Sequence, residues 1–526
     1  MCDVPQEVRE TAAASTKLET MLLVSICSAD IEICQLVTSC IRLFLEQCEF
    51  VDKYTDANRP SVSILRNGEV YREISSPSFR VTGLVAFQKR VRSLLRKLEF
   101  PAIGILNAWG IAFDKWIHLA KEVSVMPVDA VDETLLSEWR NLTGFLASAG
   151  GRCISDQPII LEEPALASLK WIDRPSSENQ EDSLLDRYLR LGVQLLACGN
   201  VRVREIMRDI FSHEVCESLY QPLFKAVEAE VEVLLTGALG QADKTQDSEV
   251  IFAEQAVSLL KEMVERFDSP SDSGAASSVH LGALSLSFAK FMDGTLESAS
   301  TLRVKIRICQ LSEMITKRKE HLNLRDDVRI RNQLLEHIFG WIHRPGSSQA
   351  EQSNKPFRKD DVWRIQKDLD KACLKTLADL TFRLPLQPLD SQTDADLNGM
   401  KSQMFHTYFN RFLSLINHES NESAGLDFPQ GLTGAEEQPS NSELAITILS
   451  NLLSANIDVG LKHSLNIGYH GNLDIRSAFI KVLYNILTQG TEFRNLSDNA
   501  VTEKYDELLN VSRLLAHHEE NHNVLS

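Results

Sequence analysis

Apolar residues recur every three or four positions along almost the whole chain, which is the periodicity of an amphipathic α-helix. Asn472 or Asp474 can cap the start of the clearest such helix, and Gly490 can end it. No segment shows the period-two alternation that is typical of a strand. The pattern therefore predicts an all-α protein. The apolar face of the clearest helix comprises Ile475, Ala478, Phe479, Val482, Leu483, Ile486 and Leu487.

Two of the predicted helix starts resemble each other. Asn200 and Asn472 are each followed, three and four positions later, by a β-branched residue and an arginine, Val203-Arg204 and Ile475-Arg476. An apolar face follows in both cases, as in the second helix of a HEAT repeat, although no strict period runs along the chain. We therefore expect a HEAT/armadillo-like α-solenoid with irregular repeats and polar linkers.

Polar stretches rich in Pro, Ser and Gly divide the chain into predicted segments. A loop is predicted over residues 51–80, which contain Pro60 and Pro77, and a polar linker over residues 418–442. The predicted domains are an N-terminal HEAT-like segment at 1–153, a linker at 154–182, a helical repeat segment at 183–344, a linker at 345–356, a further helical repeat segment at 357–490 and a C-terminal segment at 491–526.

Composition and charge add limits to this picture. Apolar residues make up 43% of the 526 residues and charged residues 24%, which is ordinary for a folded soluble protein. The formal charge of −18 disfavours nonspecific binding to nucleic acid or to an anionic membrane as the main activity, and no nucleic-acid partner is expected. The ten cysteines include no CxxC pair, which favours buried, reduced thiols.

The N-terminal region shows no targeting signal. Met1 to Glu19 is polar, and the apolar run from Met21 to Phe50 is interrupted by charged residues such as Asp30. We therefore expect no transmembrane segment and a cytoplasmic location.

A basic amphipathic helix is predicted over residues 85–98. It is the best candidate for a membrane contact or a calmodulin-like contact. A solenoid helix with a solvated basic face is the favoured interpretation, because the apolar stripe is needed for packing in any case. The stripe consists of Phe87, Val91, Leu94, Leu95 and Leu98, and the basic residues are Lys89, Arg90, Arg92, Arg96 and Lys97.

A second group of basic residues surrounds the apolar set Leu302, Ile306, Cys309 and Leu311. One interpretation is a groove for an acidic protein partner, and a solvated helix face is the favoured one. The basic residues are Arg303, Lys305, Arg307, Lys317, Arg318 and Lys319.

Motifs for catalysis, cofactors and metals are missing from the sequence. It contains no phosphate-binding glycine loop, no HExxH and no GxSxG. His337 and His343 are six positions apart and do not share a helix face. We therefore predict no catalytic residue, no cofactor and no metal ligand. A solvated tail explains the remaining cluster near the C-terminus better than a metal site does; its members are His517, His518, Glu519, Glu520 and His522.

Several segments resemble, in the same order, parts of neurofibromin and its fungal counterparts, the Ira-type Ras GTPase-activating proteins. The resemblance covers about residues 80 to 515 and corresponds to the helical region immediately before the Ras-activating domain. It implies a HEAT-like solenoid that supports this domain in proteins that lower Ras-GTP. The segments that resemble the family are Trp109–Lys121, Glu138–Cys153, Lys367–Cys373, Leu384–Pro388 and Thr447–Phe493.

The resemblance also implies where the catalytic part of the family lies. Residues 491–526 are expected to be the beginning of a truncated Ras-activating domain, and the arginine finger is expected beyond Ser526. Phe382-Arg383 mimics the finger motif, but Arg383 follows a predicted helix and is interpreted as structural. The chain itself is therefore expected to be non-catalytic.

Two functions remain open at this stage. The first is the helical-repeat regulatory part of a Ras GTPase-activating protein, a negative regulator of Ras signalling, with a Ras-type small GTPase as partner through the missing domain. The alternative is a stand-alone α-solenoid scaffold or adaptor that binds protein partners such as tubulin. The family resemblance adds a homodimer to the candidate assemblies, and a peripheral contact with a membrane stays open.

Overall fold

A computed structural model of the chain describes residues 6–54, 63–76, 83–127, 132–151, 183–237, 246–266, 280–318, 327–343, 356–388, 394–422, 439–470, 472–489, 508–515 and 517. Every regular element in these ranges is a helix, which confirms the predicted all-α class. The chain packs into two compact units, Met1–Val279 and His280–Ser526. The finer segment boundaries that we derived from the linkers stay a prediction.

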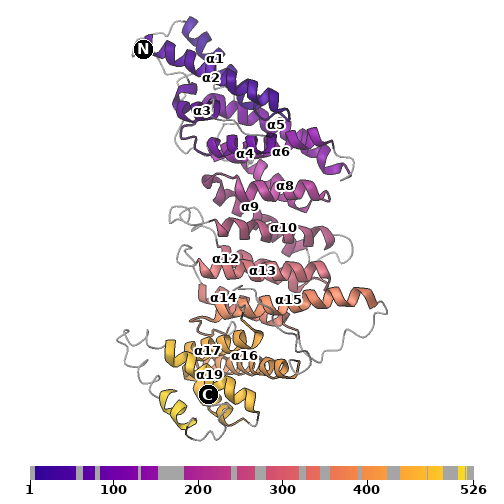
Figure 1. Ribbon diagram of the computed structural model, residues 1–526, viewed down its shortest axis with the longest axis vertical. Coiled ribbons are helices and arrows are strands. Elements are labelled where there is room, and N and C mark those ends of the chain that lie inside the picture. The colour runs from indigo at the N-terminus through magenta and orange to yellow at the C-terminus, as the bar shows by residue number, and fades with distance from the viewer. Residues whose placement is uncertain are drawn as a thin grey trace, which may run out of the picture. The chain divides into compact units, whose positions relative to one another are not determined.

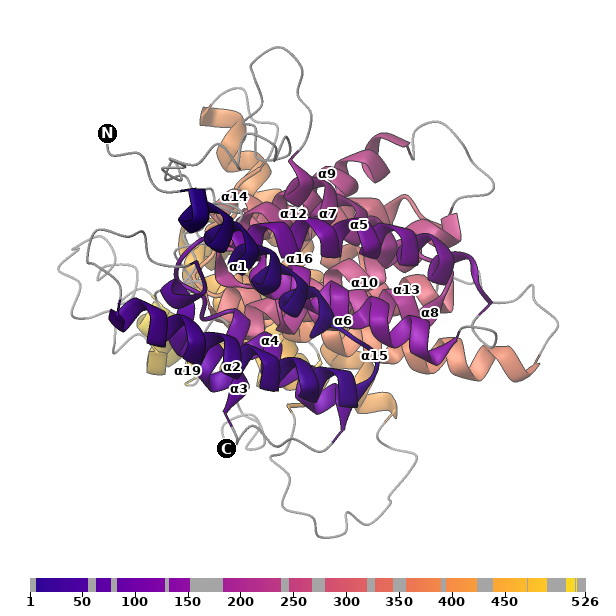
Figure 2. The same cartoon turned by 90° about the horizontal axis from the view of Figure 1, so that it is seen from above.

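The first unit stacks helices on others that are close in the chain (Figures 1 and 2). α1 packs against α5, α5 against α6, α6 against α8, and α8 against α10, as neighbouring repeats do in a solenoid. Its α-helices are α1 (Gln6–Ser25), α2 (Ile31–Tyr54), α3 (Gly68–Ser75), α4 (Leu84–Leu95), α5 (Ile103–Val125), α6 (Glu133–Ala149), α7 (Leu184–Gln194), α8 (Val201–His213), α9 (Tyr220–Gly237) and α10 (Gln246–Glu265). Short 3-10 turns are η1 (Ser63–Asn67), η5 (Leu195–Ala197) and η6 (Glu217–Leu219).

The second unit follows the same principle. α12 packs against α13 and α14, α13 against α15, α15 against α17, and α17 against α19. Its helices are α12 (Leu281–Asp293), α13 (Ala299–Lys317), α14 (Asp327–Trp341), α15 (Pro356–Thr381), α16 (Asp394–Glu422), α17 (Asn441–Ala455), α18 (Ile457–Leu465) and α19 (Leu473–Gln489), with the 3-10 turn η9 (Asn466–Tyr469). Residues 508–515 are also helical.

The two similar helix starts have the same hydrogen bonds. The side chain of Asn200 accepts from the backbone N–H of Arg202 at 3.0 Å, and Asn472 accepts from Asp474 at 2.7 Å. In each helix the arginine four positions after the asparagine donates to the carbonyl two positions before it. The pairs are Arg204 to Cys198 at 3.1 Å and Arg476 to His470 at 2.9 Å. The likeness between the two sequences is thus a likeness in local structure, and it agrees with an irregular repeat architecture.

An aromatic cluster lies in the core of the first unit, between α5, α6 and α7. Trp116 stacks on Phe113 and on Trp139, at centroid distances of 6.0 and 6.3 Å, and Tyr188 meets Trp116 edge-on. The indole N–H of Trp116 donates to Thr143 Oγ1 at 2.8 Å, so its polar atom is satisfied although the side chain is buried. The segment with two tryptophans singled out in the sequence is therefore a core element.

The predicted loop over residues 51–80 is wrong in part. α2 continues to Tyr54, and the turn η1 and helix α3 occupy residues 63–75. The apolar residues Ile64, Tyr71 and Ile74 of this segment are buried, which explains why it is ordered as helix. The segment is too short to give a clear helical period, and Pro60 and Pro77 on either side of it favour a loop.

The predicted polar linkers lie largely outside the described residues. The linker at 418–442 is too long at both ends, because α16 extends to Glu422 and α17 begins at Asn441. Most of the linkers at 154–182 and 345–356 lies outside the described residues, as do Gly490 and most of 491–526.

Of the eight described cysteines, six are buried and none forms a disulfide, as predicted.

The stretch from Thr447, which carries part of the family resemblance, consists of helices and one 3-10 turn in its described residues. α18 and η9 lie between α17 and α19. The buried Asn456 joins α17 to the segment after α15: its Oδ1 accepts from the N–H of Leu386 at 2.8 Å and its Nδ2 donates to the carbonyl of Leu384 at 3.2 Å. This side chain ties together two of the segments that carry the family resemblance.

Candidate functional site

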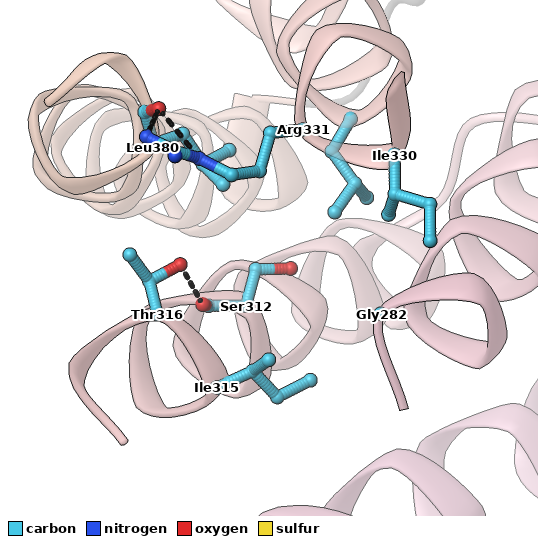
Figure 3. Close-up of a pocket in the computed structure, with 8 residues that line it drawn as sticks. Gly282, Ser312, Ile315, Thr316, Ile330, Arg331 and Leu380 are labelled. Carbon is cyan, nitrogen blue, oxygen red and sulfur yellow. Dashed lines mark hydrogen bonds between the residues drawn. The ribbon is translucent and has the colours of Figure 1, made fainter. Parts of the chain in front are cut away.

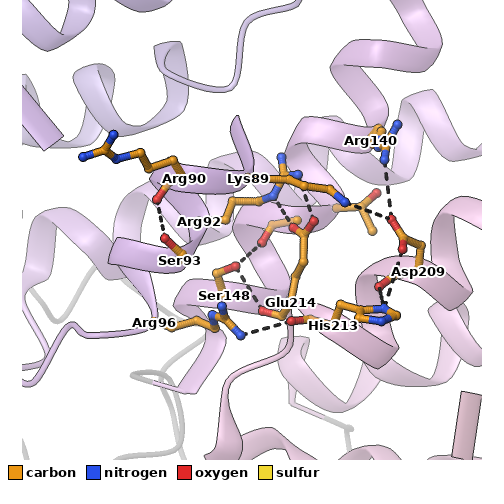
Figure 4. Close-up of polar contacts among 12 residues, drawn as sticks. Lys89, Arg90, Arg92, Ser93, Arg96, Arg140, Ser148, Asp209, His213 and Glu214 are labelled. Atoms are coloured by element: carbon orange, nitrogen blue, oxygen red, sulfur yellow. Dashed lines mark hydrogen bonds and ion pairs between the residues drawn. The ribbon is translucent and has the colours of Figure 1, made fainter. Parts of the chain in front are cut away.

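The basic helix predicted over residues 85–98 corresponds to α4, which ends earlier, at Leu95, and its predicted apolar stripe is buried within the first unit. Figure 4 shows its basic side chains together with polar residues of α6, α8 and the residues that follow α8. Lys89 forms an ion pair with Asp209 at 4.0 Å, and the same carboxylate lies 3.5 Å from Arg140. Arg96 donates to the carbonyl of His213 at 3.0 Å. Several of the basic residues of α4 therefore contact partners inside the unit.

Arg92 differs from the solvated basic residue that the sequence predicted. Its side chain is only 2% exposed and meets the carboxylate of Glu214 with two donors; Nε contacts Oε2, and Nη2 lies 3.0 Å from Oε1. Gly144 of α6 makes room for it, because a Cβ at that position would lie 2.2 Å from Arg92 Cδ. Ser148 completes the arrangement by donating to the backbone carbonyl of Glu214 at 3.2 Å. A charge is tolerated here because its countercharge is buried with it.

These contacts favour the solenoid interpretation of α4 over a calmodulin-like contact. A calmodulin target would have to free the apolar stripe from the core and the basic residues from their acidic partners. Sequence periodicity could not identify these partners, because Glu214 lies 122 positions after Arg92.

The second basic group lies on α13, and the fold adds a neighbouring basic stripe on α15. Basic residues of α15 recur at spacings of three and four, which places them on one face of the helix. Glu313 lies where the two stripes meet: it pairs with Lys317 of α13 and lies 2.9 Å from Lys375 of α15. We call this surface the α13–α15 basic face; it comprises Arg303, Arg307, Lys317, Arg318, Arg364, Lys367, Lys371 and Lys375.

The apolar set that was considered as the floor of a groove belongs mostly to the core. Leu302, Cys309 and Leu311 are at most 1% exposed. Lys305 lies 5.6 Å from the ring centre of Trp341 and 4.0 Å from Glu297. The surface of α13 is therefore charged, and these three residues do not form an apolar groove. Lys319 of the predicted basic group lies outside the described residues.

Asp293 links two side chains of α14. His337 Nδ1 lies 2.5 Å from Asp293 Oδ2, and the indole N–H of Trp341 donates to Asp293 Oδ1 at 2.6 Å. Burial raises the pKa of this carboxyl, but the hydrogen bonds from His337 and Trp341 prevail and lower it. The backbone N–H of His343 donates instead to Asp370. The two histidines thus have separate structural partners.

A small pocket in the second unit is lined mainly by apolar atoms of α12, α13 and α14 (Figure 3). Arg331 crosses beside it and donates to the backbone carbonyl of Leu380, and Ser312 and Thr316 contribute hydroxyl groups.

Within the part of the chain that the structure describes, no group of three or more His, Cys, Asp or Glu residues could hold a metal ion. Of the C-terminal cluster only His517 is described.

Arg383 lies in the turn directly after α15, where its backbone conformation has a structural role. Its backbone φ is 52°, the only positive value for a non-glycine residue in the described ranges. The N–H of Leu384 donates to the carbonyl of Thr381 at 3.1 Å, as in a tight helix ending. Arg331 also donates to the carbonyl of Phe382. These contacts support the structural interpretation of Arg383.

No single helix in the described ranges is long and apolar enough to span a membrane. Two consecutive segments, Asn441–Ala455 and Ile457–Tyr469, together have sufficient length and apolar character, but they meet at a bend of 110°.

Comparison with known proteins finds relatives that include two proteins of one yeast. Over 455 residues the chain is 22% identical to the inhibitory regulator protein IRA2 of Saccharomyces cerevisiae, and over 466 residues it is 24% identical to the inhibitory regulator protein IRA1 of the same yeast. Each alignment covers 85% of this chain and 14% of the relative. No protein-family model matches the chain. The chain is therefore related to the Ira proteins, as the residue patterns predicted, and it spans about one seventh of their length.

Proposed function

We propose that this chain is the helical-repeat regulatory part of a Ras GTPase-activating protein and acts in the negative regulation of Ras signalling. The observation that carries the proposal is the alignment with two inhibitory regulator proteins over 85% of the chain. An all-α stack of irregular repeats is a scaffold suited to holding and orienting another domain. In this proposal the Ras-type GTPase is contacted by an activating domain, and the helical array described above supports that domain.

The proposal assigns no catalytic role to the chain itself. An arginine finger must reach from an exposed loop into the active site of the GTPase, where it raises the rate about 10³–10⁵-fold. Arg383 is the residue that most resembles such a motif, and it lies in the tight turn that ends α15, with a positive backbone φ. Purified chain is therefore expected to leave the GTP hydrolysis rate of Ras unchanged in a single-turnover assay. An acceleration of about 10³-fold or more would mean that a finger lies within this chain.

The regulatory role predicts that the chain can replace the aligned segment of a yeast relative. A chimera of IRA2 carrying this chain in place of its aligned 455 residues should keep Ras-GTP low in yeast cells that lack other Ira proteins. If the chimera leaves Ras-GTP as high as a deletion of the segment does, the regulatory role is wrong.

A scaffold that binds acidic protein partners is the second candidate function, and the α13–α15 basic face favours it. Tubulin is the partner that the family resemblance suggests. Co-sedimentation with microtubules should then be lost when Arg364, Lys367 and Lys371 are replaced by glutamate. Equal sedimentation of the unchanged chain and this variant would contradict a tubulin contact at this face.

A further inference from the structure

The α13–α15 basic face is an unusual feature in a chain with a formal charge of −18. Eight basic residues share it with Glu313, Asp368 and Asp379, and Asp360 and Asp361 precede Arg364 in α15. The side chain of Glu313 is only 10% exposed and lies between two lysines, and Asp379 is half-buried. Within the described residues, no carboxylate lies within ion-pair distance of Arg303, Arg364 or Lys367. The surface therefore presents a local excess of positive charge to solvent.

The negative charge of the rest of the chain does not cancel this excess at close range. At physiological ionic strength, interactions between exposed charges are screened beyond about 8 Å. A partner that touches α13 and α15 therefore responds to the charges of these two helices. By contrast, two of the basic residues of α4 meet the carboxylates of Asp209 and Glu214.

An exposed tryptophan lies at one end of this face. The side chain of Trp363 is 62% exposed, and Lys367 Nζ lies 5.3 Å from the centre of its ring. The preceding Val362 is 41% exposed. In both views of the second unit, the N-terminal part of α15 extends beyond the ends of the neighbouring helices (Figures 1 and 2). A large aromatic side chain is thus held in solvent on a projecting helix, directly beside basic residues.

We propose that the α13–α15 basic face, together with Trp363, docks on an anionic lipid surface. Basic side chains spread over two adjacent helices match a layer of negative headgroups, to which each nearby Lys or Arg adds attraction. Tryptophan is favoured at the boundary between headgroups and acyl chains, because its ring is apolar and its N–H is polar. An acidic peptide would account for the lysines and arginines, but it would not need an exposed tryptophan beside them. This inference is independent of the proposed role in Ras regulation, and it is the alternative to an acidic protein partner at the same face.

Flotation of the purified chain with lipid vesicles tests the proposal. Vesicles made of equal parts phosphatidylcholine and phosphatidylserine should carry the chain, and vesicles of phosphatidylcholine alone should not. Binding should weaken steeply as salt is raised, because the attraction is electrostatic. Failure to bind phosphatidylserine vesicles above the phosphatidylcholine background at low salt would overturn the proposal.

Charge reversal locates the contact. The triple variant Arg364→Glu, Lys367→Glu and Lys371→Glu should lower partitioning onto phosphatidylserine vesicles by about 100-fold or more, because each basic residue near the surface contributes about a factor of five. The matched control reverses three exposed basic residues of the first unit and changes the net charge equally; it consists of Lys17→Glu, Arg187→Glu and Lys225→Glu. The control should bind nearly as the unchanged chain does. Equal losses in both triple variants would overturn the assignment to this face.

The role of Trp363 has its own control on the same unit. Trp363→Ala should weaken vesicle binding several-fold, whereas Tyr484→Ala, which removes an aromatic ring that is 65% exposed, should leave it unchanged. Both variants should keep the circular dichroism melting curve of the unchanged chain, since both side chains lie in solvent. If polyglutamate peptide binds this face while phosphatidylserine vesicles do not, an acidic protein is the partner and the lipid proposal is wrong.

Discussion

At the scale of single residues, the first unit shows how a charge can be held in a helical core. Arg92 and Glu214 are both buried and meet through two donor–acceptor pairs. Taking two charges out of water costs several kcal/mol, and their mutual attraction offsets this cost only while both are present. The pair thus makes α4, α6 and the residues after α8 depend on one another.

Glu214→Gln should therefore destabilise the first unit strongly. The substitution leaves the Arg92 charge buried without a countercharge, and we expect a loss of about 3–5 kcal/mol in the free energy of unfolding. Urea unfolding monitored by the fluorescence of the buried tryptophans measures this loss. Glu133→Gln is the control, because Glu133 forms a similar two-donor pair with Arg202 at the surface, where water replaces the lost contact. Equal unfolding midpoints for both variants would show that the buried pair contributes no more than a surface pair.

The left-handed backbone of Arg383 gives a second prediction. Glycine adopts a φ of 52° without steric cost, whereas a β-branched residue does not. Arg383→Gly should therefore unfold at least as late in urea as the unchanged chain, and Arg383→Val should lose about 1–3 kcal/mol. A glycine variant that is as unstable as the valine variant would mean that the arginine side chain, and not the backbone, determines this helix ending.

His463 of α18 should make stability depend on pH. Burial, and then the neighbouring His406 whose ring centre lies 3.3 Å away, lower the pKa of His463. The unfolded chain therefore binds more protons than the folded chain once pH falls to the ordinary histidine pKa of about 6.5, so stability is lost as pH falls below that value. The melting temperature should fall less between pH of about 7 and about 5.5 in His463→Gln than in the unchanged chain. His118→Gln, a change at an exposed histidine, should not alter this dependence; a reduction as large as in the His463 variant would contradict the assignment.

Sequence patterns were least informative about the burial and contacts of individual residues. Periodicity placed Phe87 and Val91 of α4 correctly in the core. It could not predict that Arg92 is buried as well, because its partner Glu214 and the space above Gly144 come from distant parts of the chain. The α15 basic stripe, in contrast, is encoded locally in the spacing of Arg364, Lys367 and Lys371, so it can be found from the sequence alone.

At the scale of elements, α19 shows the relation between pattern and packing most clearly. Its predicted apolar residues Ile475, Phe479, Val482 and Leu483 are at most 5% exposed, while Tyr484 on the opposite side is 65% exposed. α19 packs against α17 and α16 through this face. Because the period of an amphipathic helix is encoded locally, such an element can be predicted without knowledge of its neighbours.

Truncation of this face should therefore cost stability. Phe479→Ala or Leu483→Ala is expected to lower the free energy of unfolding by about 2–5 kcal/mol through lost burial and the cavity that remains. Tyr484→Ala on the same helix should have little effect because its ring is exposed. Thermal melting distinguishes the cases, and an unchanged melting temperature for Phe479→Ala would mean that α19 does not depend on this face for its packing.

Short elements were harder to predict. Pro60 and Pro77 frame the segment with η1 and α3 and favour a loop there, but Tyr71 and Ile74 pack into the core. A helix of eight residues offers too few turns for a clear period, so its tertiary contacts decide its structure.

At the scale of the whole molecule, the fold class could be predicted and the function only through the resemblance. Helical periodicity and the similar starts at Asn200 and Asn472 indicate a stack of irregular helical repeats, and the arrangement within each unit agrees with this. A fold of this kind serves many functions, so it does not identify one. The relation to IRA2 and IRA1, over 85% of this chain, supplies the link to inhibitory regulators.

Whether this helical array supports the regulation of Ras, as proposed above, is decided by the IRA2 chimera. The measured quantity is the fraction of Ras bound to GTP in yeast cells whose only Ira protein is the chimera. We expect a fraction close to that of cells with unchanged IRA2, and a higher fraction when the chimera carries Phe479→Asp and Leu483→Asp in the core of α19. A chimera that is expressed at normal levels and yet leaves the Ras-GTP fraction as high as in cells without any Ira protein would contradict the account.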